Sequence, residues 1–151
     1  MASPPRNATS SCRFSASDLD LDSVNQAREG IYPEAAVADI TPARLKRFFT
    51  REEHGYRIIP ELRSAVVFTR QDVLGDPPFS RLDLISCRNL LIYLQPEAQA
   101  RVIAIFHFAL RDGGVLLLGS AETVNSSDGR FAVISKAGRI FRKQGASNNT
   151  P

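Results

Sequence analysis

The stretch DPPFSRLDLISCRNLLIYL, Asp76–Leu94, decides the fold. It begins with a Pro-Pro turn, which cannot be helix, and continues into the apolar segment Leu82–Cys87, which is typical of a strand. Arg88, Asn89 and Tyr93 stand where that strand ends. Because open α/β sheets bind ligands at the carboxyl ends of their strands, the stretch predicts a strand with a ligand-binding edge.

Strand and helix patterns alternate along the rest of the chain. The patterns predict, in order, a strand at 13–17, a helix at 22–29, a helix that starts at Thr41 and Pro42, short strand runs at 56–59 and 65–69, a helix from Pro96 to about Arg111, a strand at 115–118 and a hairpin of 131–135 with 139–142. The runs at 56–59 and 65–69 are either a hairpin-like excursion or two separate strands. We expect Gly113–Gly114 to end the long helix and 115–118 to be buried on both faces. The alternation favours α/β class with a mostly parallel sheet and a C-terminal antiparallel hairpin.

The composition is that of one ordinary globular domain, with 151 residues, 43% hydrophobic and 8% aromatic. We expect residues 1–11 to be a disordered leader, 12–144 to form the domain and 145–151 to be a disordered tail. No apolar run approaches the roughly 18 residues of a membrane span, and the first residues have no signal-peptide core. The sequence therefore predicts a cytoplasmic protein without membrane insertion.

Charge, cysteine and histidine patterns narrow the function classes. The 19 basic and 16 acidic residues are interspersed, so nucleic-acid binding is not expected, although an Arg-rich surface suits carboxylate partners. Cys12 and Cys87 are far apart, and no Cys/His cluster is present in the sequence, so we expect reduced thiols and no metal site. We expect His107 to be a partly buried, hydrogen-bonded imidazole.

Polar residues follow three of the predicted strands. Asp18 ends the first strand, Asp72 follows the run at 65–69, and Arg88–Asn89 with Tyr93 follow the strand of the opening stretch. An acidic residue between a strand and a helix can bind ribose hydroxyls, or it can cap the helix, and Asp18 and Asp20 could divide these two tasks. Because parallel strands end at one edge of a sheet, the three positions are expected to converge and to hold an adenosine.

Several segments together carry a family resemblance. They are SASDLDLDSVNQAREGIYPE at 15–34, RLKRFF at 44–49, YRIIPELRSAVVF at 56–68, the opening stretch, FHFALRDGGVLLLGSAET at 106–123 and RIFRK at 139–143. The chain from about Cys12 to Lys143 resembles the SAM-binding domain of CheR-type chemotaxis-receptor methyltransferases, and CRNLLIY at 87–93 with GSAE at 119–122 is specific to that family. It is most similar to the branch fused to CheB-like methylesterase and sensor domains. The resemblance implies a Rossmann-like methyltransferase fold.

The resemblance also implies an activity and a set of site residues. The family transfers a methyl group from S-adenosylmethionine to glutamate side chains of methyl-accepting chemotaxis receptors and leaves S-adenosylhomocysteine. Carried over by position, Asp18 binds the ribose, and Asp72 and Val73 lie beside the adenine, at a position where many members have Asn. Arg88 and Asn89 line the methionine side of the cofactor. Tyr93 lies near the transferred methyl. Tyr93 and Arg88 are the expected catalytic residues. From the residues alone, Tyr93 can equally be a core or rim aromatic.

The family domain begins earlier than this chain. A first strand, its Gly-rich loop and a helical domain are expected before the strand that holds Asp18, and that first strand lies between the strands of Asp18 and Arg88 in the family's sheet. We therefore expect a partial domain with two unpaired strand edges, weak cofactor binding and weak or no activity alone. The loop REEHG at 51–55 is short, so tethering to a receptor peptide through this region is not expected.

The resulting hypothesis is a SAM-dependent protein-glutamate O-methyltransferase. The alternative is a non-catalytic interaction or regulatory module of a larger chemotaxis-type sensor protein. The alternative predicts that Tyr93→Phe and Asn89→Ala leave signalling unchanged, whereas disruption of the helix that starts at Pro96 does not.

Overall fold

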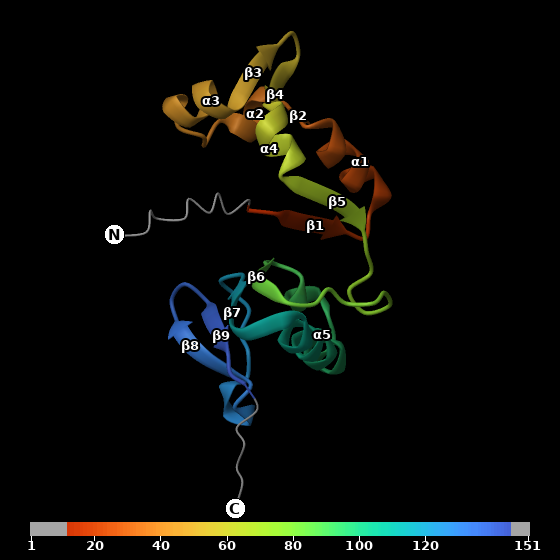
Figure 1. The fold of residues 1–151 in the computed structure, drawn as a ribbon, viewed down its shortest axis with the longest axis vertical. Coiled ribbons are helices and arrows are strands. Elements are labelled where there is room, and N and C mark those ends of the chain that lie inside the picture. The colour runs from red at the N-terminus through yellow and green to blue at the C-terminus, as the bar shows by residue number, and fades with distance from the viewer. Residues whose placement is uncertain (1–11, 146–151) are drawn as a thin grey trace, which may run out of the picture. The chain divides into compact units, whose positions relative to one another are not determined.

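The structure, a computed structural model, describes residues 12–145 and divides the chain into two compact units, one ending at Asp72 and the other starting at Val73 (Figure 1). The predicted leader, 1–11, lies outside the described residues, as does all of the predicted tail except Gly145. The mixture of helices with parallel and antiparallel strands confirms the predicted α/β class.

The first unit contains two separate sheets. Its elements are β1 (Phe14–Asp18), α1 (Leu21–Glu29), β2 (Ile31–Tyr32), α2 (Glu34–Val37), α3 (Pro42–Phe48), β3 (Phe49–Glu52), β4 (Gly55–Ile58), α4 (Pro60–Ser64) and β5 (Val66–Arg70). Strands β1 and β5 pair in parallel, with Asp18 opposite Arg70. Strands β2, β4 and β3 form an antiparallel sheet in that order, which the sequence patterns did not predict. Strand β3, FTRE, is too short and too charged to show an alternating pattern.

Helix α4 decides between the two interpretations of the runs at 56–59 and 65–69. Pro60 occupies the first turn of α4, where a proline is tolerated, and the helix separates β4 from β5. The two strands belong to different sheets. The hairpin interpretation was therefore wrong, and the interpretation as two strands is confirmed.

The second unit is a four-stranded sheet with one long helix. Its elements are β6 (Leu82–Cys87), the 3₁₀ turn η1 (Leu91–Tyr93), α5 (Pro96–Ala109), β7 (Leu110–Leu118), the 3₁₀ turn η2 (Ser126–Asp128), β8 (Phe131–Ser135) and β9 (Ile140–Lys143). The strand order is β6-β7-β9-β8, with β6 parallel to β7 and the other two pairings antiparallel. The predicted parallel strand and closing hairpin are confirmed.

The boundary between α5 and β7 differs from the prediction. Leu110 already has extended backbone angles and is fully buried, so the helix ends at Ala109 and Gly113–Gly114 lies inside β7. The buried core cluster of this unit comes from α5, the loop before it, β7, the segment after β7, β8 and β9: Leu91, Val102, Phe106, Leu110, Leu116, Leu118, Val124, Phe131 and Phe141. On the other face of β7, Val115 and Leu117 are only half-buried, so the predicted burial holds for one face.

Strands β1 and β6 are edge strands of their sheets within residues 12–145. Strand β1 pairs only with β5, and β6 pairs only with β7. Apolar side chains on these strands are exposed, with Phe14 at 51% and Leu84 at 53%. An edge strand presents backbone N–H and C=O groups that no neighbouring strand binds, and the expectation that these two edges belong to a partial domain stays a prediction.

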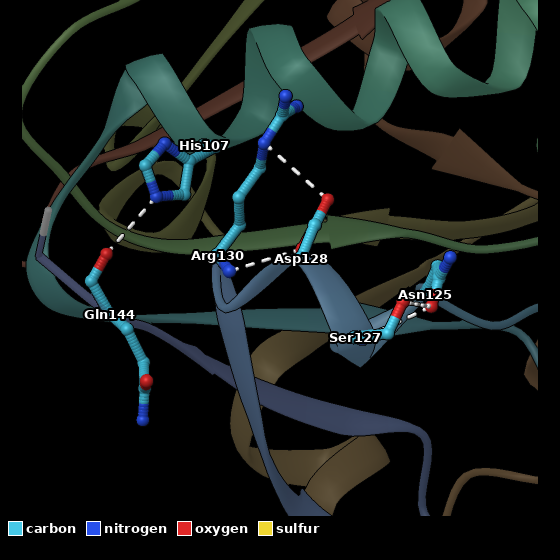
Figure 2. A network of polar contacts seen from close by, with 6 residues as sticks. All are labelled: His107, Asn125, Ser127, Asp128, Arg130 and Gln144. Atoms are coloured by element: carbon cyan, nitrogen blue, oxygen red, sulfur yellow. Dashed lines mark hydrogen bonds and ion pairs between the residues drawn. The ribbon is translucent and has the colours of Figure 1, made fainter. Parts of the chain in front are cut away.

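His107 on α5 lies in a polar network near the end of the chain (Figure 2). Its Nε2 lies 3.1 Å from the carbonyl oxygen of Gln144, and its half-buried ring meets Phe131 edge to face at 5.5 Å. The predicted hydrogen-bonded imidazole is confirmed. In the described residues, no cluster of three or more His, Cys, Asp or Glu side chains is arranged to hold a metal ion, and no helix is long and apolar enough to cross a membrane.

Candidate functional site

The carboxyl end of β6 leads into a short loop that presents three of the predicted site residues. Asn89 has a left-handed backbone with φ of +62°, a conformation that asparagine tolerates better than most residues, and the chain then turns into η1. Arg88 and Asn89 are exposed, and Tyr93 is 80% exposed. The interpretation of Tyr93 as a core aromatic was therefore wrong, because its ring lies at the surface.

A buried carboxylate binds the backbone of this loop from another segment. Glu122 is 3% exposed. Its Oε2 accepts the N–H groups of Gly119 at 2.7 Å and Asn89 at 3.0 Å, and its Oε1 accepts the N–H of Leu91 at 2.7 Å. Burial by itself raises the pKa of Glu122, but hydrogen bonds from these N–H groups and from Ile92 outweigh that effect and hold the pKa below its ordinary 4.5. The side chain is thus ionised at neutral pH.

Gly119 leaves no room for a side chain at this contact. A Cβ there would lie 2.6 Å from Asn89 Oδ1 and 2.8 Å from Glu122 Oε2. Only glycine lets the end of β7 approach the loop so closely.

Gln99 on α5 binds the same loop through its carbonyl groups. Its Nε2 donates to the carbonyl oxygens of Leu91 at 2.8 Å and Leu94 at 3.0 Å. The loop after β6 is therefore held at its N–H groups by Glu122 and at its carbonyl groups by Gln99.

In the first unit, the structure separates the roles of the two aspartates at the end of β1. Asp20 is the N-cap of α1 and accepts the N–H groups of Asp22 and Ser23, while the Ser23 hydroxyl contributes most to lowering the pKa of Asp20. Asp18 Oδ1 accepts the N–H of Asp20 at 2.9 Å. Asp18 is exposed. Asp18 is thus not the residue that caps α1, and its binding of the ribose stays a prediction.

Asp72 follows the strand that neighbours Asp18. Asp18 and Arg70 are paired across β1 and β5, and the N–H of Gln71 donates to the carbonyl oxygen of Asp18 at 2.9 Å. Asp72 is exposed just beyond this point. Val73 is half-buried and packs against the core cluster of the second unit. The structure thus places Asp18 and Asp72 at or just beyond the ends of two paired strands in one unit, and Arg88, Asn89 and Tyr93 on the segment after β6 in the other.

Glu122, Gly119 and Gln99 were not predicted as site residues. Glu122 lies in the GSAE segment at 119–122, where a single acidic residue follows a continuous apolar strand. An acidic residue directly after an apolar strand is the sequence feature that could have identified Glu122 as a site residue. Nothing local shows that the partner of Glu122 is a loop more than 30 residues away.

The comparison with known families decides the family. The family described as "CheR methyltransferase, SAM binding domain" matches residues 2–140. The chain belongs to this family. The predicted methyltransferase class and the family's cofactor, S-adenosylmethionine, are confirmed at this level.

Two curated proteins resemble the chain over most of its length. A 104.1 kDa Rhodobacter capsulatus protein encoded in the hypE 3′ region is 42% identical over 84% of this chain and 13% of its own length. Chemotaxis protein methyltransferase 2 of Vibrio cholerae is 31% identical over 85% of this chain and 44% of its own length. The chain therefore spans less than half the length of either relative.

A solved structure shares the fold. A possible exported protein from Bordetella parapertussis matches 88% of this chain and 54% of its own chain, with a TM-score of 0.52 and 15% identity. This likeness concerns the fold alone.

The exposed polar groups fit S-adenosylmethionine as a ligand. Its ribose carries hydroxyl donors, and Asp18 is an exposed aspartate at a strand end. Its methionine part carries a carboxylate and an amino group, which match an exposed guanidinium at Arg88 and an exposed carboxamide at Asn89.

Proposed function

We propose that the protein is a SAM-dependent protein-glutamate O-methyltransferase that acts on methyl-accepting chemotaxis receptors. The match of the CheR methyltransferase family to residues 2–140 carries this proposal. The loop after β6, which exposes Arg88, Asn89 and Tyr93 together, supports it. The 13% coverage of the Rhodobacter relative leaves room there for further domains, so methylesterase and sensor domains, fused or associated, are proposed partners.

We assign each site residue a task. Asp18 accepts hydrogen bonds from the ribose, and Asp72 with Val73 borders the adenine. Arg88 and Asn89 line the methionine side. Arg88 also binds the acceptor carboxylate, which a planar guanidinium can do with two hydrogen bonds. Tyr93 orients the acceptor oxygen.

In this reaction the main task of the protein is to align the methyl donor with the acceptor carboxylate. S-adenosylmethionine supplies a methyl group on a positively charged sulfur, and its transfer to a carboxylate oxygen leaves S-adenosylhomocysteine without any proton transfer. A glutamate side chain with a pKa of about 4.3 is already ionised at pH 7, so no general base is required. Correct orientation of two reactants can supply roughly 7–11 kcal/mol of the barrier reduction. A site of a few exposed polar groups on a rigid loop therefore suffices.

We further propose that the chain by itself binds the cofactor weakly. The open edges of β1 and β6 support this, because each of these strands is held by a neighbouring strand on one side alone. The same open edges favour the second candidate, a non-catalytic module that pairs with another part of a larger sensor protein.

Two measurements test the proposed function. The first is calorimetric titration of S-adenosylhomocysteine into the chain and into the same chain extended with the residues encoded upstream in its gene. We expect tight binding only for the extended protein. Tight binding by the chain alone would contradict the weak-binding proposal, and no binding by either form would contradict the assignment.

The second measurement is transfer of a labelled methyl group to the cytoplasmic part of a chemotaxis receptor. We expect base-labile label, as a glutamyl ester gives, and its loss when the receptor glutamates are replaced by alanine. Binding of S-adenosylhomocysteine without any methyl transfer would favour the regulatory module.

A further inference from the structure

The loop after β6 makes few hydrogen bonds of its own. Within it, the N–H of Tyr93 donates to the carbonyl of Leu90 at 3.1 Å, and the N–H of Leu94 donates to the carbonyl of Leu91 at 3.0 Å. The N–H groups of Asn89 and Leu91 have Glu122 as their hydrogen-bond acceptor. Leu91 itself is buried in the core cluster, so its N–H cannot turn to water instead.

The carboxylate of Glu122 connects three places that are separate in the sequence. It joins the end of β6 at Asn89, the first turn of η1 at Leu91, and the end of β7 at Gly119. Hydrogen bonds to an ionised acceptor are about twice as strong as neutral ones. A single buried side chain therefore sets the backbone on both sides of the left-handed residue Asn89.

A side chain at residue 119 would collide with the Asn89 side chain as well. The Asn89 Oδ1 and the Glu122 Oε2 both lie where a Cβ of residue 119 would stand. A side chain at residue 119 would therefore press on both the Asn89 carboxamide and the carboxylate that accepts the Asn89 N–H.

We propose that Glu122 is a positioning residue for methyl transfer: its buried carboxylate orders the backbone from Asn89 to Ile92 and so directs Asn89 toward the methionine side of the cofactor and Tyr93 toward the acceptor. The role rests on the proposed function. Glu122 acts through the loop and does not touch cofactor or acceptor. An apolar residue of similar size would fill the space but would leave the loop N–H groups without an acceptor.

The test compares Glu122→Gln with a matched control. The substituted carboxamide keeps the size and one acceptor oxygen, but its NH₂ group faces N–H donors, so part of the hydrogen-bond set is lost. The control is Asp128→Asn, an equal carboxylate-to-amide change in the same unit. Asp128 Oδ1 accepts one backbone N–H, that of Arg130 at 3.1 Å, in an exposed turn (Figure 2).

Both variants are made in the extended protein. Four quantities are measured for each: kcat of methyl transfer, KM for the receptor, S-adenosylhomocysteine affinity, and the rates of amide hydrogen exchange. For Glu122→Gln we expect faster exchange at residues 89, 91 and 119 and a kcat lowered about 10-fold or more, since small misplacement of reacting groups is costly. KM for the receptor should change about 3-fold or less. Glu122→Asp, which keeps the charge, should recover part of kcat. Asp128→Asn should behave as the wild type.

Two further results distinguish a failure of the positioning role from a failure of the proposed function. If Glu122→Gln loosens the loop amides but leaves kcat and cofactor affinity unchanged, the positioning role is overturned. If the wild-type extended protein itself neither binds S-adenosylhomocysteine nor transfers methyl, the proposed function fails and this role fails with it.

If Glu122→Gln does not fold, Gly119→Ala tests the same positioning role. Gly119→Ala keeps the carboxylate and pushes against the Asn89 carboxamide. We expect a folded protein with a lowered kcat, and a folded Gly119→Ala variant with wild-type kcat and wild-type affinity would overturn the proposal.

Discussion

The carboxylate of Glu122 accepts the backbone N–H of Leu91 at 2.7 Å across 31 positions of sequence. The same carboxylate binds Asn89, two residues earlier, through its other oxygen at 3.0 Å. One buried anion thus determines the path of the loop that carries Arg88, Asn89 and Tyr93. The stability of the second unit and the geometry of its candidate site depend on the same side chain.

Replacing Glu122 should destabilise the second unit. Glu122→Ala leaves at least three backbone N–H groups without their acceptor, two of them buried and one half-buried, and we expect a loss of about 2–4 kcal/mol in the free energy of unfolding. Urea denaturation followed by circular dichroism measures this change. Asp128→Ala, which removes an exposed carboxylate, should cost less than about 1 kcal/mol. Equal losses in the two variants would contradict the importance of the buried contact.

The contribution of Glu122 should disappear in acid. Its pKa is lowered in the folded state, so the ionised form stabilises the fold above the ordinary value of 4.5 and this stabilisation is lost as pH falls through the lower folded pKa. The free energy of unfolding should therefore exceed that of Glu122→Gln by a constant amount between pH 6 and 7. Below 4.5 this difference should shrink. Denaturation series at several pH values measure it, and a difference that grows in acid would contradict the lowered pKa.

The two cysteines should differ in reactivity. Burial, and to a smaller degree the negative charge of Glu122, raise the pKa of the Cys87 thiol to about 11. At pH 8 roughly one thiol in a thousand is then the reactive thiolate. Cys12 is exposed. Iodoacetamide followed by mass spectrometry should modify Cys12 first and Cys87 only after unfolding in guanidinium chloride; equal rates in the native protein would contradict this.

Tyr93 should matter for activity and little for stability. Because its side chain is 80% exposed, Tyr93→Phe should change the free energy of unfolding by less than about 0.5 kcal/mol. If Tyr93 orients the acceptor, kcat should fall about 10-fold or more while S-adenosylhomocysteine affinity stays the same. Unchanged methyl transfer would remove Tyr93 from the catalytic residues.

The role of Asn89 needs a substitution that keeps its backbone. Asn89→Ala would add strain of about 1 kcal/mol, because alanine disfavours a φ of +62°. Asn89→Gly accepts this conformation and removes only the carboxamide. We expect Asn89→Gly to weaken S-adenosylhomocysteine binding about 10-fold in the extended protein, as loss of a hydrogen bond to a charged group would, with near wild-type stability. Calorimetry and thermal unfolding measure the two quantities.

The sequence by itself determined the features that depend on neighbouring residues. The apolar run at Leu82–Cys87 identified β6, Pro96 marked the start of α5, and Gly30, with a φ of +69°, ended α1 as expected of a left-handed cap. The segments CRNLLIY and GSAE indicated the CheR family, which the family match confirmed. Periodicity, capping and family motifs are local in sequence, which is why the sequence alone indicates them.

The tertiary structure alone decided which residues meet. Asp20 rather than Asp18 caps α1, helix α4 separates β4 from β5, and α5 stops at Ala109 because Leu110 is drawn into the buried strand β7. The contact of Glu122 with Asn89 exists only because β6 and β7 lie side by side and Gly119 has no side chain. Hydrogen bonds across more than 30 residues depend on strand pairing and burial, and no local pattern of the sequence encodes them.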